Sequence, residues 1–169
     1  MRGSAKGDRL LMKLLSVCLL AAAVSIAAPA YAGQAKAAAG GAKPRTIELT
    51  GTEKMKFDKE EIVAKPGETI RIVLKAEGTM PKAIMAHNFV LLKPGADAAE
   101  FNKAAFNARE TGFIPPDKKD EVIAATGLAG AGETVEITFK VPAKPGSYNY
   151  FCSFPGHFAM GMRGKLMVK

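Results

Sequence analysis

Short segments of alternating apolar and polar residues, separated by turn signals, dominate the chain from residue 45 to its end. The clearest are Thr69–Leu74 and Glu133–Lys140, in which every second side chain is apolar. This period of two is typical of strands with one buried face. Further strand-like segments lie at 46–50, 62–64, 87–92, 122–125, 147–152 and 164–169. Pro-Gly pairs supply tight turns between several of them. The pattern predicts an all-β fold, a Greek-key β-sandwich of seven to eight strands.

One short helix is expected among these strands. Asp97 followed by Glu100 resembles a capping box, which marks the start of a helix. Phe101 and three alanines then fall on one helical face. We therefore predict a helix from about residue 98 to 108 that covers part of the sandwich and carries no chemistry of its own.

The first 32 residues have a different character. Four basic residues precede an apolar run at 14–28, and the segment 29–32 ends in an Ala-Tyr-Ala cleavage motif. This layout predicts a secretory signal peptide cleaved after Ala32, and therefore a periplasmic or otherwise exported protein. The apolar run is shorter than the roughly 20 residues of a membrane-spanning helix, so we expect no stable membrane span after cleavage. Residues 33–44 then form a flexible leader to one domain, 45–169.

The charge of the chain limits its partners. The chain has 169 residues and a net charge of +8. Removal of the predicted signal peptide leaves 20 basic and 15 acidic residues, a net charge of +5. Such a charge favours encounter with acidic protein surfaces. No cluster of Lys and Arg with interleaved aromatic residues is present, so we expect no nucleic-acid partner.

The segment 150–162 gathers the residues with the most distinctive chemistry. It contains Cys152, His157, Met160 and Met162, and the only other cysteine of the chain lies in the predicted signal peptide. A thiolate, an imidazole and a thioether suit copper, and His87 is the one remaining histidine. We therefore hypothesise a trigonal copper site of two imidazoles and one thiolate, with one of the two methionines as a weak axial ligand.

Three stretches together resemble a known family. Ile84–Leu91, Phe151–His157 and Met162–Leu166 are similar to the motifs of cupredoxins, in particular the azurin and auracyanin branch. The resemblance covers about 45–169. It implies a blue copper protein that carries single electrons between redox proteins and is not an enzyme.

Carried over by position, the resemblance implies a copper ligand set and its surroundings. The ligands would be His87, Cys152, His157 and Met162, which favours Met162 over Met160. The Asn88 side chain would tie the two ligand segments together near Ser153, and the backbone N–H groups of Asn88 and Phe154 would point at the Cys152 sulfur. Such groups tune the potential and rigidity of a metal site.

The resemblance also implies a docking surface for redox partners such as c-type cytochromes or a copper enzyme. This apolar patch would lie near Met85, Phe154, Pro155 and His157. Ala86 departs from the family pattern, because azurin has a glycine there whose carbonyl approaches the metal. Phe158 fits either the core or the patch.

Three other functions are compatible with parts of this pattern. Cys152 and His157 are a nucleophile and a base, as in a hydrolase, but no third orienting residue is evident. A copper oxidase or nitrite reductase needs further histidines, and the chain has two in all. A copper-binding or delivery protein is the main alternative to an electron carrier.

Overall fold

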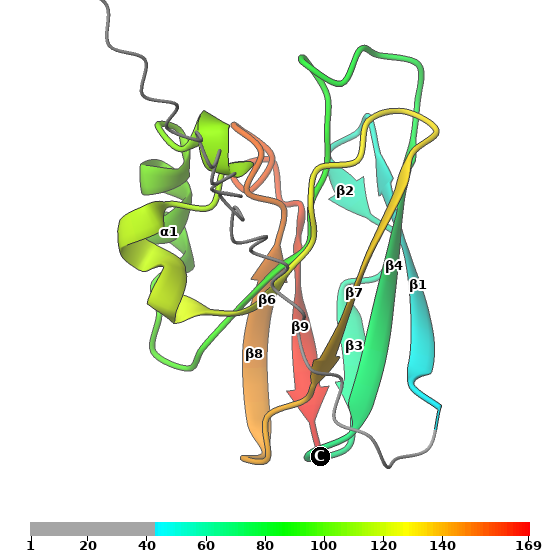
Figure 1. Cartoon of the computed structure of the whole chain (residues 1–169), viewed down its shortest axis with the longest axis vertical. Coiled ribbons are helices and arrows are strands. Elements are labelled where there is room, and N and C mark those ends of the chain that lie inside the picture. The colour runs from blue at the N-terminus through cyan, green and yellow to red at the C-terminus, as the bar shows by residue number, and fades with distance from the viewer. Residues whose placement is uncertain (1–42) are drawn as a thin grey trace, which may run out of the picture. The chain divides into compact units, whose positions relative to one another are not determined.

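The computed structural model describes residues 43–169, so the predicted signal peptide and all but the end of the predicted leader lie outside them. The described chain forms two β-sheets (Figure 1). The first has the order β2-β1-β4-β7 and the second the order β3-β9-β8-β5-β6. The strands are β1 (Arg45–Thr52), β2 (Lys56–Phe57), β3 (Glu61–Ala64), β4 (Thr69–Glu77), β5 (Val90–Leu92), β6 (Val122–Ala125), β7 (Thr134–Lys140), β8 (Gly146–Phe151) and β9 (Arg163–Val168).

The prediction of a two-sheet β-sandwich is confirmed, with one strand more than expected. The additional strand is β2, which consists of two residues paired antiparallel with the end of β1. In the turn before it, Met55 has a positive φ of 54°. Glycine is the usual residue in this conformation, so a methionine here gives no sequence signal for the turn. β1 pairs with β4, and β3 with β9, in parallel, while the other pairs are antiparallel.

Alternation along the strands builds the core between the sheets. Ile47 and Leu49 of β1 and Ile70, Ile72 and Leu74 of β4 all point inward and are buried. Burial of this apolar surface is the main stabilising term of such a fold, at about 25 cal/mol per Å².

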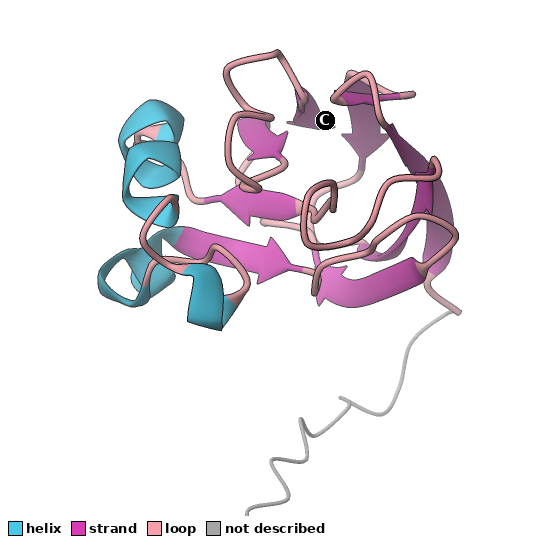
Figure 2. Ribbon diagram, turned by 90° about the horizontal axis from the view of Figure 1, so that it is seen from above, coloured by secondary structure: helices cyan, strands magenta, loops and turns pink. Residues whose placement is uncertain are grey.

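The second sheet is covered on its outer face as well. Val90 and Leu92 of β5 lie on the outer face and pack with Phe101 and Phe151, whereas Leu91 belongs to the core between the sheets. All three residues of β5 are therefore buried. The helical region that covers this face lies to one side of the strands in Figure 2.

The helix α1 (Ala98–Ala105) begins where the sequence predicts and ends three residues earlier. The Asp97 side chain caps it by accepting hydrogen bonds from the N–H groups of Ala99 and Glu100. At its end the backbone changes to bonds between residues three apart, at Asn107 and Ala108. Two 3₁₀ helices follow, Arg109–Thr111 and Pro116–Glu121.

His87 does not begin a regular strand, contrary to the prediction of a strand at 87–92. β5 starts only at Val90, and His87 forms an isolated bridge with Ala129. The side chain of Thr126 takes the Phe89 N–H, so the ladder is interrupted between His87 and Val90. The loop after β8 lies at the end of the sandwich opposite the C-terminus, the upper end in Figure 1.

Candidate metal centre

The loop between β8 and β9 is a compact hydrogen-bonded turn. The N–H of Cys152 donates to the Met162 carbonyl at 3.0 Å, and the N–H of Met162 donates to the His157 carbonyl at 2.9 Å. The N–H of His157 donates to the Phe154 carbonyl at 3.1 Å, across a bend in which Gly156 has a φ of 85°. Glycine adopts that conformation without steric cost. These bonds fix Cys152, His157 and Met162 relative to one another.

His87 reaches the same point from the other side of the chain. Its N–H and carbonyl both bond to Ala129, each at 2.8 Å, which holds its backbone in place. Its ring lies 5.0 Å from the ring of His157, centroid to centroid. The bridge to Ala129 therefore fixes the backbone of His87, as the hydrogen bonds of the loop fix Cys152, His157 and Met162.

The side chains of His87, Cys152 and His157 converge. One donor atom from each lies within 4.8 Å of the others, and all three residues are buried. The two Nδ1 atoms are 3.3 Å apart, and His157 Nδ1 lies 3.4 Å from the Cys152 sulfur. Two imidazoles and a thiol that share one buried cluster are the donor set that would hold a copper ion of the blue type.

Burial keeps these three groups uncharged in the metal-free protein. It lowers the pKa of His87 to about 4 and the pKa of His157 to about 4. Burial also raises the pKa of the Cys152 thiol to about 12. The imidazoles are thus in their metal-binding form at neutral pH, whereas the thiol must release its proton when a metal binds. A fully buried thiol of this kind is unsuited to attack a substrate, which argues against the hydrolase alternative.

Asn88 joins the two ligand segments. Its Oδ1 accepts the Ser153 N–H at 2.8 Å, and its Nδ2 donates to Ser153 Oγ at 2.9 Å. Nδ2 also donates to the Gly112 carbonyl at 3.2 Å. The backbone N–H groups of Asn88 and Phe154 act against the effect of burial and lower the pKa of the Cys152 thiol. Such groups favour the thiolate.

The two methionines occupy different environments. Met162 is fully buried, and its methyl group lies against the same part of β1 as the His87 ring. Met160 is 56% exposed. The Ala86 carbonyl lies 3.9 Å from the Cys152 sulfur. Of the two thioethers, Met162 is therefore the one buried beside the donor cluster.

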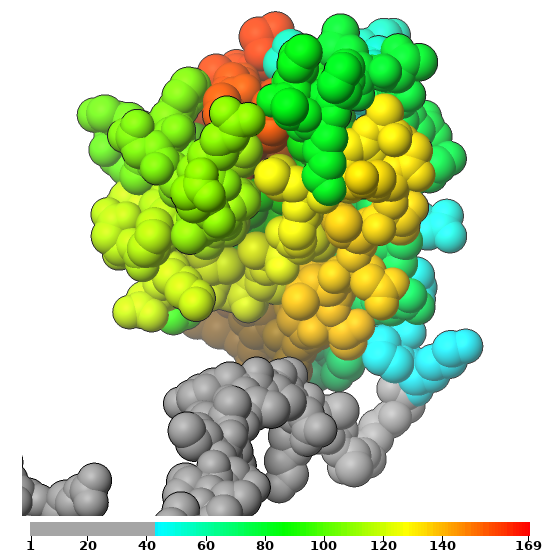
Figure 3. Space-filling view, turned by 45° about the horizontal axis from the view of Figure 1, so that its top comes forward, coloured from blue at the N-terminus to red at the C-terminus, as the bar shows by residue number. Residues whose placement is uncertain are grey.

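The surface above the cluster differs from the expected patch. Met85 and Phe154 are only 9% and 8% exposed, and His157 only 2%. Phe154 is covered partly by Phe113, whose ring meets it edge-on at 5.1 Å. Figure 3 looks onto this end, where the orange-red loop lies between the yellow-green helical region and the green segment before β5. Ile84 and Met160 are the exposed apolar side chains of the two ligand segments.

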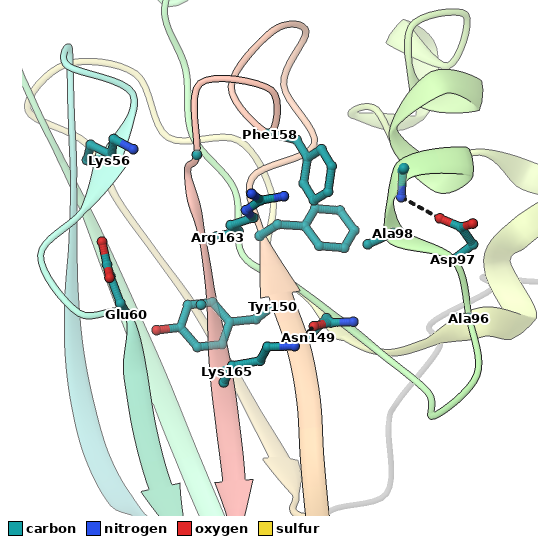
Figure 4. Close-up of a pocket in the computed structure, with 14 residues that line it drawn as sticks. Lys56, Glu60, Ala96, Asp97, Ala98, Asn149, Tyr150, Phe158, Arg163 and Lys165 are labelled. Atoms are coloured by element: carbon teal, nitrogen blue, oxygen red, sulfur yellow. Dashed lines mark hydrogen bonds between the residues drawn. The ribbon is translucent and has the colours of Figure 1, made fainter.

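Phe158 belongs to the packing of the helical region. Its ring meets Phe151 edge-on at 5.5 Å, and the guanidinium of Arg163 lies 5.1 Å from its centroid. Figure 4 shows Phe158 and Arg163 at the border of a hollow of about 780 Å³, which Lys56 and Lys165 also line. The hollow lacks the imidazole and thiol donors of the loop. Phe158 therefore packs with the apolar cluster under the helical region.

Two residues that contact the site had not been expected from the sequence. Gly112 supplies a carbonyl to Asn88, and Gly51 lies against His87 and Met162. A glycine in a strand signals a close backbone approach in general terms, but not the identity of the neighbour.

Comparison with known proteins agrees with this geometry. The model of the copper-binding proteins of the plastocyanin/azurin family matches residues 46–169. Auracyanin-A of Chloroflexus aurantiacus is 39% identical over 130 residues, 76% of each chain. Azurin-1 of Alcaligenes xylosoxydans xylosoxydans is 39% identical over 128 residues, which are 73% of this chain and 96% of the azurin.

Solved structures give the same result. Reduced auracyanin from Roseiflexus castenholzii superposes with a TM-score of 0.66 and 38% identity, over 76% of this chain and 99% of the auracyanin. Auracyanin A of Chloroflexus aurantiacus, described as a "blue" copper protein, gives a TM-score of 0.67 at 38% identity, over 75% and 100% of the two chains. With two motifs that converge on one His-Cys-His cluster, the chain belongs to the plastocyanin/azurin family of copper-binding proteins, the blue copper electron carriers.

Proposed function

We propose that this protein is exported and carries single electrons through one copper ion bound by His87, Cys152, His157 and Met162. The convergence of His87, Cys152 and His157 in one buried cluster carries the proposal. The family match over the whole described domain supports it. A copper ion in such a site alternates between Cu(I) and Cu(II).

The protein contributes rigidity to this function. Asn88 and Ser153 fix the two ligand segments to each other, and the bridge at Ala129 fixes His87. A ligand set that is held by the fold moves little when the charge at its centre changes, and little movement makes electron transfer fast. The N–H groups of Asn88 and Phe154 stabilise negative charge on the Cys152 sulfur.

The site class is tested by adding Cu(II) to the purified metal-free protein and recording the visible spectrum. The proposal predicts an intense blue absorption that reductant bleaches reversibly, and its complete loss in Cys152→Ser. A reversible one-electron potential with fast exchange to a cytochrome supports electron transfer. Rapid loss of Cu(I) to an acceptor protein, without such exchange, would refute it in favour of copper delivery.

The axial ligand is tested by a matched pair of variants. Met162→Gln replaces the buried thioether beside the cluster, whereas Met160→Gln alters an exposed side chain. The first variant is expected to change both spectrum and reduction potential, because the axial ligand tunes both. Equal effects of the two substitutions contradict the assignment of Met162.

We further propose that redox partners such as c-type cytochromes or a copper enzyme dock on the ligand loop around Pro155. Pro155 is half-buried, and the exposed Ile84 and Met160 belong to the two ligand segments. Ile84→Lys and Met160→Lys should slow electron exchange with the partner and leave the blue spectrum unchanged. Unchanged exchange rates in both variants argue against this surface.

Export is the part of the proposal that concerns the predicted signal peptide. None of the helices within residues 43–169 has the length and apolar character that a membrane crossing requires. Secretion with cleavage after Ala32 predicts a mature protein that starts at Gly33, which the mass of the protein recovered from the periplasm or culture medium determines. A mass that includes residues 1–32 would show instead that the segment is retained.

A further inference from the structure

Gly51 occupies a core-facing position of β1 at the metal end of the sandwich. The inward residues of this strand are Ile47, Leu49 and Gly51, in agreement with the period of two. The first two fill the core with large aliphatic side chains, whereas the third contributes no side chain. The space that a side chain would need at residue 51 is taken by other groups.

These groups belong to two of the four proposed copper ligands. A Cβ atom at residue 51 would lie 2.9 Å from Cγ of His87, 3.0 Å from its Cδ2 and 2.9 Å from Cε of Met162. All three distances are at or below the closest approach of a Cβ atom in folded proteins. The backbone of β1 therefore directly supports the His87 ring and the Met162 methyl group.

The backbone conformation of Gly51 does not itself require glycine. Its φ lies outside the left-handed region, unlike that of eight other glycines in the described chain. Glycine within a strand costs roughly 0.5–1 kcal/mol relative to alanine. Close approach of the two side chains is the structural reason for glycine here.

We propose that Gly51 is a positioning residue for the copper site, an inference that rests on the function proposed above. Its missing side chain lets the His87 ring lie directly against β1 while Nδ1 of that ring is 3.3 Å from Nδ1 of His157. The same gap admits the end of the Met162 side chain beside that ring. Gly51 thereby determines where the Met162 thioether lies relative to the His87 ring.

Gly51→Ala displaces Met162 more than His87. The clashing atom of Met162 is the free end of a flexible side chain, whereas Cγ of His87 is the root of a ring whose backbone is held by Ala129. A displaced thioether changes the axial interaction, which tunes the potential and the spectrum. The metal-free protein relaxes more easily, because its ligands are not tied to an ion.

The experiment compares Gly51→Ala with Gly127→Ala. Gly127 is exposed, has no positive φ, and a Cβ there meets nothing within 4 Å. Both variants and the wild type are titrated with Cu(II) and examined by absorption, electron paramagnetic resonance and voltammetry. In the metal-free proteins, the methyl resonance of Met162 is recorded by ¹³C-labelled methionine NMR.

Only Gly51→Ala is expected to shift the visible bands, the reduction potential and the Met162 methyl resonance. It is also expected to bind Cu(II) about tenfold more weakly, because the added methyl group overpacks the copper-bound protein more than the metal-free protein. If the wild type has the blue spectrum and Gly51→Ala matches Gly127→Ala in all these measurements, the inference is wrong. If the wild type lacks the blue spectrum, the proposed function fails, and the methyl resonance still decides whether Gly51 positions Met162.

Failure of Gly51→Ala to fold is covered by a second comparison. Truncation in Met162→Ala removes one of the two side chains that a Cβ at residue 51 would strike. Residues in contact have coupled effects on stability. Gly51→Ala should therefore lower the denaturation midpoint less, or fold again, in the Met162→Ala background. An equal loss in both backgrounds overturns the inference.

Discussion

Asn88→Ala should be among the most destabilising substitutions of a polar residue in this domain. Asn88 is fully buried, and its side chain makes three hydrogen bonds of 3.2 Å or less, two with Ser153 and one with Gly112, besides a longer one of 3.3 Å from the Ser153 hydroxyl to Oδ1. Loss of the two bonds donated by Nδ2 costs about 1 kcal/mol each. Loss of Oδ1 leaves the buried N–H of Ser153 without that acceptor, which costs about 1–3 kcal/mol. The expected loss is therefore about 3–5 kcal/mol of unfolding free energy.

Ser153→Ala is the matched control. It removes the hydroxyl that Nδ2 reaches at 2.9 Å, but keeps the 2.8 Å bond from the Ser153 N–H and the bond to Gly112. The expected loss is about 1 kcal/mol. Urea unfolding of the three metal-free proteins, followed by circular dichroism, measures both values if the slopes agree. A difference of less than about 1 kcal/mol between the two variants would falsify the claim that Asn88 holds both ligand segments.

Three further substitutions test other parts of the domain. Glu53 accepts hydrogen bonds from the backbone N–H groups of Thr79 and Met80, which lower the pKa of its carboxyl group below the usual 4.5. Its ionised form therefore stabilises the fold at neutral pH, and this stabilisation is lost as the pH falls through the folded-state pKa. The stability advantage over Glu53→Gln should thus shrink below pH 4.5 in acid titration, and a constant difference is inconsistent with this. Gly164→Ala drives a methyl group into the Tyr150 ring and the backbone carbonyl of Glu60, and should cost about 1–3 kcal/mol in urea unfolding. Asp97→Ala removes the cap of α1 and should lower stability by about 1 kcal/mol, which Asp97→Asn largely restores.

The metal cluster was predictable because its residues are rare and chemically distinctive. The chain has two histidines, and the one cysteine outside the predicted signal peptide lies near His157. A ligand set of this kind can be recognised without any knowledge of the fold. The structure adds that the three side chains are buried and within reach of one ion.

Features that depend on tertiary packing were not predictable. The approach of Gly51 to His87 follows from the parallel register of β1 and β4 and from the way the two sheets face each other. The burial of Phe154 depends on Phe113, which arrives from a separate loop at a positive φ of 64°. Local periodicity contains no information on such contacts, so the burial of Phe154 could not be predicted.

The boundaries of local structure failed where side chains replace backbone partners. His87 reads as the start of a strand by its apolar neighbours, yet Thr126 takes the hydrogen bond that a neighbouring strand would make with Phe89. The helix ends earlier than predicted because, after Ala105, backbone hydrogen bonds between residues four apart give way to bonds between residues three apart. Sequence patterns locate an element better than its ends.

The place of β9 in the second sheet makes that sheet depend on a long-range pairing. β9 follows β8 in the sequence, yet it lies inside the sheet between β8 and the much earlier β3. The second sheet therefore stays open until β3 pairs with β9. Long-range pairings of this kind also form slowly. Cys152, His157 and Met162 lie close together in the sequence, whereas His87 belongs to a distant segment, so the complete metal site can form only when distant parts of the chain have come together.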